Sequence, residues 1–370
     1  MQNWFSFKNG SKKSPQFLHL CDPQYIAEKE LLQKWIDRFT PTDHLNKVIH
    51  QFQTSFRSVF WELYLSEIFQ EEGMEIIHSG TSPDFELKKK EKTFFVEAVT
   101  ANFSQSELSE EYRTLSDING ENDIYPIIDK SIIRVSNAIS NKFNEFNKTY
   151  SLEGRLESHP YIIAVYDCSQ INYGQVGFYS LLALLYRARF DPDDKLDLQI
   201  LCNDEFYTEE YKYQESISKD NGSPIPLGLF CDENYSDISA ILFTCTLTLG
   251  KLSSLVGSCS IPRSIIIERK YPKSGTVMQF LRYSGSSSDE FLGDGLFLFI
   301  NNYAKNPIHA DFLEQEGINI ISYDSEENVI RIRYCGKKIP NIFMRRYVNY
   351  PGEEIDIINP NTMLWYKPVR

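Results

Sequence analysis

Three acidic residues stand where a carboxylate could bind a metal ion, because each lies beside apolar sequence. Glu62 lies in an apolar helical run, Asp84 directly follows Pro83, and Glu97 is in the middle of the most apolar strand of its region. Carboxylates are rarely buried unless they are paired or bind a metal. Carboxylates that meet would suit a hard divalent cation such as Mg²⁺, which takes one or two of them together with waters and substrate phosphate.

The elements expected around these residues would bring them together. Apolar residues at three- and four-residue spacing predict a helix from about 45 to 72, with Glu62 at the edge of its apolar stripe. Residues 84–87 alternate, and residues 93–100 are rich in β-branched and aromatic types, which predicts two strands joined by a basic tip at 88–92. Acidic side chains on adjacent antiparallel strands can face each other across the ladder.

A second helix is predicted from about 126 to 146, with proline in its first turn. Lys142 lies on the row of this helix that should face the sheet, in line with its apolar stripe, which consists of Ile128, Ile132, Val135, Ile139 and Phe146. From that row the lysine could reach the carboxylates and be held cationic by them. The alternative is that its side chain passes the edge of the core to reach water.

The residues and the order of elements resemble the PD-(D/E)XK nuclease superfamily. Its pattern is Pro-Asp, then an acidic residue, any residue and a lysine on the next strand. Here Pro83-Asp84 is followed, after twelve residues, by Glu97-Ala98-Val99. A short strand at 74–78 and a buried strand at 161–167 complete the expected order of helix, three strands, helix and strand. The resemblance covers about 45–170 and implies a restriction-endonuclease-like αβββαβ core with a mixed α/β sheet.

The resemblance also implies roles for individual residues. Asp84 and Glu97 would bind Mg²⁺ or Mn²⁺, with the main-chain carbonyl of Ala98 as a further ligand. Glu62 occupies the place of a helix glutamate that often joins the site in this family, where it would hold a second metal ion or a water.

Val99 departs from the family pattern, which has lysine at this position. That lysine helps to position and activate the attacking water and stabilises charge on the phosphate. Some family members supply it from a different element, and Lys142 is the candidate for that role here.

The resemblance implies a metal-dependent endonuclease that hydrolyses the phosphodiester bonds of nucleic acid, with DNA favoured over RNA. Restriction, anti-phage defence, repair and mobile-element roles all occur in the superfamily, and a homodimer is common where two strands are cut. The alternative is a nuclease-like fold that no longer cleaves and serves as a nucleic-acid or protein binding module, for which Val99 is the main argument. A third interpretation is an interaction protein that uses its 51 aromatic residues beyond the needs of the core.

The distribution of charge leaves the nucleic-acid hypothesis open. The net charge of −13 argues against a nucleic-acid partner, but residues 151–240 alone carry −10, whereas residues 241–370 carry +2. Basic residues near the C-terminus interleave with aromatic ones, which suits phosphate contact and base stacking, or else marks a solvated strand face. These residues are Arg331, Arg333, Lys337, Lys338, Arg345 and Arg346.

The length of 370 residues predicts two or three domains. We expect an arm at 1–45, the nuclease-like core at 46–170 and an extension at 171–370. The extension would continue the same sheet or form a second α/β unit, and could recognise substrate.

No stretch has the ~18 apolar residues of a membrane helix, and no signal peptide is expected, so we expect a cytoplasmic protein. The seven cysteines lack metal-ligand spacing and predict reduced thiols.

Overall fold

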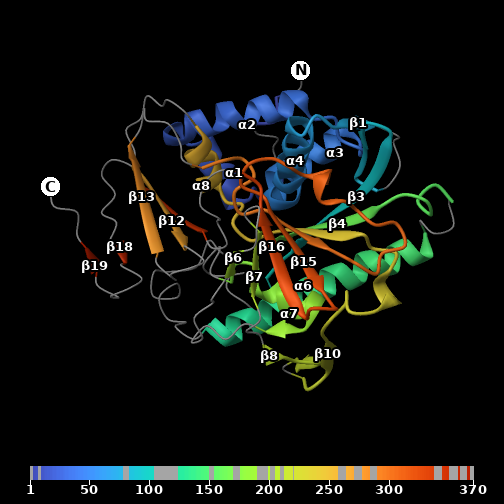
Figure 1. Ribbon diagram of the computed structural model, residues 1–370. Coiled ribbons are helices and arrows are strands. Elements are labelled where there is room, and N and C mark those ends of the chain that lie inside the picture. The colour runs from blue at the N-terminus through green and yellow to red at the C-terminus, as the bar shows by residue number, and fades with distance from the viewer. Residues whose placement is uncertain are drawn as a thin grey trace.

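The chain folds into three layers, with helices on both faces of one ten-stranded mixed sheet (Figure 1). The computed structural model describes residues 3–6, 10–77, 83–103, 124–149, 154–169, 176–189, 199–200, 205–208, 212–219, 221–256, 264–270, 277–283, 290–336, 344–349, 357–358 and 365–366. The predicted mixed α/β class is therefore confirmed.

The main sheet has the strand order β1-β2-β3-β4-β11-β14-β15-β16-β7-β6. The bounds of these strands, in that order, are Glu75–Ile77, Phe85–Lys89, Lys92–Ala101, Tyr161–Asp167, Ala240–Thr244, Phe297–Ile300, Asn319–Asp324, Val329–Tyr334, Glu205–Thr208 and Gln199–Ile200. Strand β4 pairs in parallel with both β3 and β11, so the expected extension continues the same sheet across residue 170.

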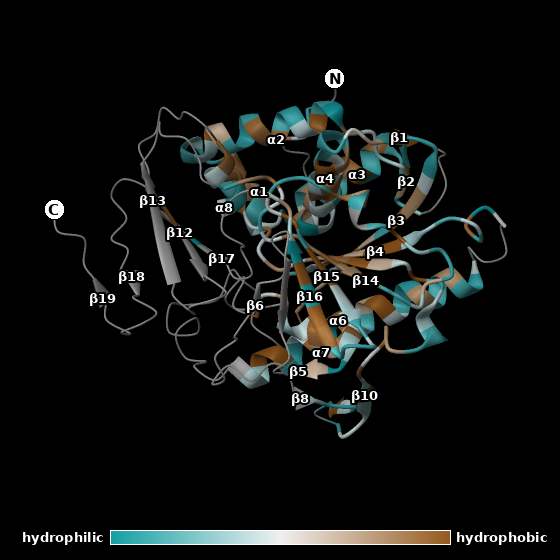
Figure 2. Cartoon of the chain, viewed as in Figure 1, coloured by the Kyte–Doolittle hydropathy of each residue, from teal (hydrophilic) through white to brown (hydrophobic). Residues whose placement is uncertain are grey.

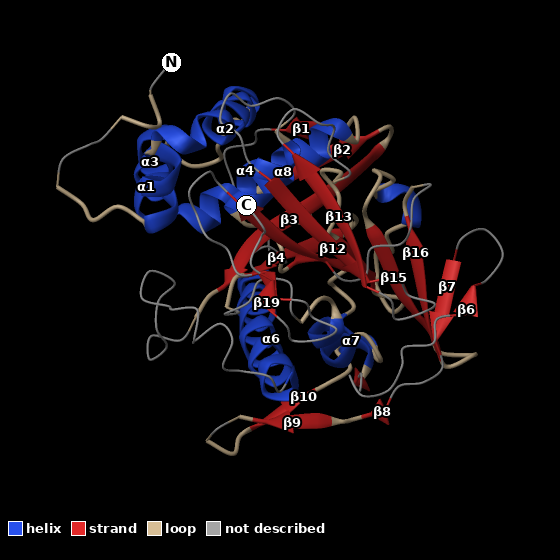
Figure 3. Ribbon diagram, turned by 90° about the vertical axis from the view of Figure 1, so that its left-hand side faces the viewer, coloured by secondary structure: helices blue, strands red, loops and turns tan. Residues whose placement is uncertain are grey.

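Of the helices in the part of the chain that the structure describes, five lie on one face of the sheet, namely α1 (Pro15–Cys21), α2 (Ile26–Arg38), α3 (Leu45–Thr54), α4 (Phe56–Glu71) and α8 (Leu249–Leu255). The other face carries α6 (Ile124–Lys148) and α7 (Tyr179–Tyr186) (Figure 3). Within the described residues, short 3₁₀ turns occur at Pro23–Tyr25, Glu233–Tyr235 and Ala310–Phe312.

Successive strand residues belong to different cores, because side chains alternate between the faces of a sheet. Phe95 packs into the core under α6 and α7, whereas Val96 packs under α1–α4. The same alternation separates Ile163 from Ile162 on β4. Since both faces are covered, the central strands β4, β11 and β14 are buried and mostly apolar, and Figure 2 shows brown segments in β4 and β14.

The single helix predicted from 45 to 72 is wrong, because two helices meet at Ser55. The backbone of Ser55 leaves the helical region, with φ −133° and ψ 48°. Its carbonyl accepts hydrogen bonds from both the N–H and the hydroxyl of Ser58. Serine favours such local bonds over a continuous helix. The break lets Phe52 and Phe56 pack with their ring centroids 5.2 Å apart.

A separate three-stranded sheet has the order β13-β12-β17, with bounds Val277–Tyr283, Ser264–Lys270 and Met344–Asn349. The remaining short pairs are β9 with β10 (Ser216–Ser218 and Pro224–Pro226), β5 with β8 (Ala188–Arg189 and Lys212–Tyr213), and β18 with β19 (Ile357–Ile358 and Trp365–Tyr366).

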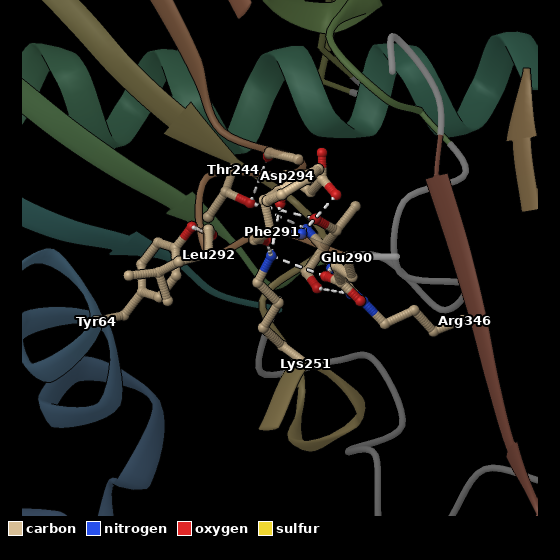
Figure 4. A network of polar contacts seen from close by, with 10 residues as sticks. Tyr64, Thr244, Lys251, Glu290, Phe291, Leu292, Asp294 and Arg346 are labelled. Carbon is tan, nitrogen blue, oxygen red and sulfur yellow. Dashed lines mark hydrogen bonds and ion pairs between the residues drawn. The ribbon is translucent and has the colours of Figure 1, made fainter. Parts of the chain in front are cut away.

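A buried ion network joins the three-stranded sheet to the main body (Figure 4). The Glu290 carboxylate lies 2.7 Å from Lys251 Nζ of α8 and 2.5 Å from Arg346 Nη2 of β17. Lys251 also donates to the main-chain carbonyls of Phe291 and Asp294, and Arg346 donates to that of Thr246. Although burial alone would raise the pKa of Glu290, the two cations lower it to about 2.

This network corrects one expectation about the C-terminal basic residues. Arg346 is bound to Glu290 inside the protein, and Arg331 binds Asp324 and Glu327 on its own hairpin. Arg346 is therefore not placed to line a substrate path, whereas the ion pairs of Arg331 fit the alternative of a solvated strand face. Lys337 and Lys338 lie outside the described residues.

Five cysteines within the described residues are free thiols, as expected: Cys21, Cys168, Cys231, Cys245 and Cys335. Cys202 and Cys259 lie outside those residues. Among the helices that the structure describes, none combines the length and the apolar character needed to span a membrane.

Candidate active site

The β2–β3 hairpin brings Asp84 to the segment that carries Glu97. The antiparallel register pairs Phe85 with Val96, so Asp84 stands directly before the first paired residue, opposite Glu97. Asp84 Oδ2 accepts a hydrogen bond of 2.8 Å from the N–H of Ala98. Thr42 holds the main chain at this point, since its hydroxyl donates to the Asp84 carbonyl at 2.9 Å. The two carboxylates are thus neighbours in space, as the strand pattern predicted.

Lys142 reaches Glu97 from the helix on that face of the sheet. Its Nζ lies 2.5 Å from Glu97 Oε1 and 3.0 Å from Glu145 Oε2. Glu97 is nearly inaccessible, with 4% of its side chain exposed, whereas 23% of the Lys142 side chain is exposed. The lysine therefore turns toward the carboxylate rather than passing it to reach water. Its position agrees with the helix periodicity, and its catalytic role stays a prediction.

Glu62 completes the acidic group from α4, across from the hairpin. It is half-buried, and its charge interacts with those of Asp84 and Glu97. Asp43 adds a further negative charge nearby, and Lys47 partly offsets it. Glu62, Asp84, Glu97 and Lys142, the four side chains singled out in the sequence, thus interact in one region of the molecule.

The carboxylates of this region resist ionisation. Burial, with the charges of Asp84, Asp43 and Glu97, raises the pKa of Glu62 to about 8. Burial and Asp84 raise the pKa of Glu97 to about 7, against the opposing effect of Lys142. Burial also raises the pKa of Asp84, although the Ala98 N–H and Lys142 act in the opposite direction. A single lysine thus leaves excess negative charge when all three carboxylates ionise.

Lys142 stays cationic in this environment. Burial alone would lower its pKa, but the charges and hydrogen bonds of Glu97 and Glu145 raise it above the ordinary lysine value. An ammonium group has three donors, and two of them are directed at these carboxylates. The third can be directed at a phosphate oxygen or a water molecule.

The donor set fits a hard divalent cation. Oxygen ligands from one or two carboxylates suit Mg²⁺, and excess buried negative charge favours binding of a cation. Within the described residues, no three Asp, Glu, His or Cys side chains are arranged to hold a metal ion by themselves. The set named from the sequence needs only Asp84, Glu97 and the Ala98 carbonyl, with the other ligands supplied by waters and substrate.

Five residues of this region were missed in the sequence, Asp43 and Lys47 among them. Glu145 stands one helical turn from Lys142, so its spacing could have revealed it. Thr42 and Arg155 carry no such signal, because they lie in loops that only the tertiary fold brings close. Arg155 binds Glu86 at 3.2 Å and covers the Phe95 ring, on the same strand pair as Asp84 and Glu97. Val99, at the family's lysine position, packs against the apolar core.

We expect the metal-free protein to lose stability as the pH rises from 5 to 8. Glu62 keeps its proton in the folded state up to a pKa of about 8, but releases it near ~4.3 when unfolded. The folded state then binds more protons, so the free energy of unfolding falls by up to about 1.4 kcal/mol per pH unit. Urea unfolding at pH 5 and pH 8 measures this. Glu62→Gln should flatten the dependence, and Glu30→Gln, at an exposed position on α2, should not. If the free energy of unfolding changed with pH equally in the wild type and in Glu62→Gln, this prediction would be wrong.

Comparison with protein-family models, curated proteins and solved structures found no match to this chain.

Proposed function

We propose that the protein is a divalent-metal-dependent nuclease that hydrolyses phosphodiester bonds of nucleic acid, with DNA favoured over RNA. The observation that carries the proposal is the contact of Lys142 with Glu97, beside Asp84. Two adjacent carboxylates and a lysine are the charged groups of the PD-(D/E)XK pattern, with the lysine supplied by the following helix instead of position 99. We propose the restriction-endonuclease-like core on the same ground.

Asp84, Glu97 and the Ala98 carbonyl would hold Mg²⁺ or Mn²⁺. A bound ion would supply a Lewis acid that polarises the phosphate and lowers the pKa of water. The hydrogen bond from the Ala98 N–H orients the Asp84 carboxylate before any ligand arrives. Such a preorganised group needs no rearrangement during the reaction, which is the main advantage of an electrostatic site.

Lys142 would place a positive charge against the phosphate oxygens as negative charge develops on them. Its ion pairs with Glu97 and Glu145 fix the direction of the ammonium group. Glu62 would bind a water or a second metal ion. Its raised pKa of about 8 keeps it largely protonated at neutral pH without a cation. A cation that binds nearby would favour release of that proton.

A second candidate function is a nuclease-like module that binds nucleic acid or protein without cleaving it. Val99 favours this alternative, because the strand itself lacks the family's lysine. The net charge of −13 adds support. The two functions differ in one measurable property, which is metal-dependent cleavage.

A cleavage assay tests the proposal with supercoiled plasmid, linear DNA, single-stranded DNA and RNA. Each substrate is incubated with Mg²⁺, Mn²⁺ or EDTA. We expect cutting of DNA that EDTA abolishes, and a loss of about 10²-fold or more in Asp84→Asn and Glu97→Gln, because each variant removes a charged group from the site. Glu30→Gln on α2 is the matched control and should retain full activity. Cleavage that survives both site variants, or no cleavage by the wild type, would contradict the proposal.

A further inference from the structure

We propose that Lys142 is an exchangeable counter-ion of the candidate metal site. Its ammonium group pairs with Glu97 in the metal-free protein, and it is retained by Glu145 alone when a divalent cation binds. The inference rests on the proposed function, because it concerns the regulation of that same site. It starts from the position of the lysine between two carboxylates of very different accessibility.

Lys142 covers Glu97. Its Nζ atom lies 2.5 Å from Glu97 Oε1, and 4% of the Glu97 side chain is exposed, against 23% for Lys142. Glu97 is in β3 and Lys142 is in α6, and the two elements pack together. A metal ion that approaches this oxygen from solvent therefore meets the lysine first. The Oε1 atom becomes available as a metal ligand only after Nζ moves.

The charge of Lys142 also acts on Asp84, the second predicted ligand. Asp84 stands opposite Glu97 in the β2–β3 hairpin. Lys142 interacts electrostatically with both carboxylates. A divalent cation bound to the same pair would face this ammonium group at short range, and like charges repel more strongly where water is partly excluded. Lys142 and a divalent cation therefore compete for the two carboxylates.

Glu145 offers Lys142 a second partner that is already in contact. Glu145 Oε2 lies 3.0 Å from Nζ, and 45% of the Glu145 side chain is exposed. A lysine side chain is a flexible four-carbon chain. Rotation of its torsions can therefore break the contact with Glu97 while α6 stays in place. The ammonium charge keeps one carboxylate partner throughout the exchange.

Lys251 provides a contrast within the same protein. It is buried, and besides Glu290 it binds the main-chain carbonyls of Phe291 and Asp294. Among the contacts of the described residues, Lys142 donates to the side chains of Glu97 and Glu145 and to no main-chain carbonyl. Lys142 can therefore leave one partner without leaving a backbone acceptor unpaired, whereas Lys251 cannot.

The exchange has two consequences for the site. Without a divalent cation, the protein's own lysine keeps Glu97 covered. With one, Glu97 is uncovered and the ammonium group moves to its more exposed partner, Glu145. A substrate phosphate would approach from that accessible side. Binding of the cation and presentation of the lysine to the substrate are thus one event.

The test measures metal binding without nucleic acid. Isothermal titration calorimetry gives the Kd for Mn²⁺ and for Ca²⁺ at pH 8, where protons compete less for the carboxylates. We expect Lys142→Met to lower the Kd by about tenfold or more, because the competing charge is gone. Asp84→Asn should raise the Kd, which assigns the binding to this site. Lys34→Met is the matched control on α2, and it should leave the Kd within about twofold, since exposed distant charges are screened.

A double-mutant cycle tests the role of Glu145. If Glu145 retains the displaced lysine, Glu145→Gln should raise the Kd in the wild type and change it much less in Lys142→Met. Equal effects in both backgrounds would mean that Glu145 acts on the cation directly, and would overturn its part in the exchange. Glu30→Gln, at an exposed position on α2, is the control for the loss of one carboxylate.

Reductive methylation with formaldehyde and cyanoborohydride, read by peptide mass spectrometry, follows the lysine itself. Methylation of Lys142 should increase when Ca²⁺ replaces EDTA, because the ammonium group leaves the nearly inaccessible Glu97, whereas Lys34 should react equally in both. Metal binding that leaves the methylation of Lys142 unchanged would overturn the proposal. A Kd that is the same in the wild type and in Lys142→Met would also overturn it, as would the absence of binding of either metal.

The two proposals fail in different ways. If the wild type cleaves DNA with Mg²⁺ but Lys142→Met binds Mn²⁺ and Ca²⁺ no more tightly, the exchange is refuted and the nuclease stands. If Lys142→Met binds both metals more tightly and Ca²⁺ exposes Lys142, but no nucleic acid is cut, the nuclease is refuted and the exchange stands.

Discussion

Replacing Lys142 with methionine is expected to lower the cleavage rate by about 10²- to 10³-fold. The substitution keeps the length of the side chain but removes the positive charge that lies 2.5 Å from Glu97. That charge would otherwise meet the phosphate as negative charge builds on its oxygens. Binding of DNA should change much less than the rate, because the charge of Lys142 would act mainly on the negative charge that develops in the transition state.

The measurement is single-turnover cleavage of a labelled duplex with Mg²⁺, together with the Kd in Ca²⁺. Lys34→Met is the matched control, because Lys34 is an exposed lysine on a helix of the opposite face. Thermal unfolding of each variant shows whether the fold is retained. A Lys142→Met protein that folds and cuts within about twofold of the wild-type rate would remove Lys142 from the mechanism.

The pH dependence of this variant provides a second readout. The ammonium group of Lys142 lowers the pKa of Glu97, which is nevertheless raised to about 7. Without the lysine, Glu97 should release its proton at a still higher pH. The rise of the cleavage rate with pH should therefore move to more alkaline pH in Lys142→Met, whereas a lysine with only a structural role would leave the profile unchanged.

The second large effect is expected on stability, from Glu290→Gln. Glu290 is the only carboxylate that the described contacts place against both Lys251 and Arg346. Its loss removes the carboxylate that both buried cations share and leaves them mainly with main-chain acceptors, which costs about 3–5 kcal/mol of unfolding free energy. Since α8 and β17 meet through this residue, the effect should extend to the packing of the three-stranded sheet on the main body.

Urea unfolding near pH 7 measures the loss, and hydrogen exchange in β12 and β17 locates it. Glu327→Gln is the matched control, because Glu327 pairs with Arg331 at the surface with 64% of its side chain exposed. Surface pairs contribute little, so this variant should unfold like the wild type. An equal stability of the two variants would show that the buried network does not hold the sheet in place.

The stability of the protein at low pH depends on the same residue, Glu290. The pKa of Glu290 is lowered to about 2 in the folded state, below the ~4.3 of an unfolded glutamate. Its stabilising contribution is therefore present above about pH 4.3 and is lost as the pH falls toward 2. This direction is opposite to that of Glu62, which weakens the fold as the pH rises.

Local patterns in the sequence predicted part of the arrangement of the candidate site. A two-stranded hairpin has one register that keeps its apolar face buried, so Asp84 and Glu97 had to become neighbours. A helix that packs its apolar row against a sheet brings Lys142 toward that sheet, whereas its contact with Glu97 rather than with water was one of two alternatives. These inferences held because both depend on short-range periodicity and on burial. The chemistry assigned to the three residues stays a prediction.

The tertiary structure alone decided which distant segments meet. The strands after residue 170 join the same sheet because β11 pairs with β4, and nothing in their local patterns selected this over a separate unit. Lys251, Glu290 and Arg346 come from three separate segments, and buried charges find partners only when packing brings them together. The helix break at Ser55 has a local cause instead, because the N–H and hydroxyl of Ser58 donate to the Ser55 carbonyl where the helical pattern in the sequence continues.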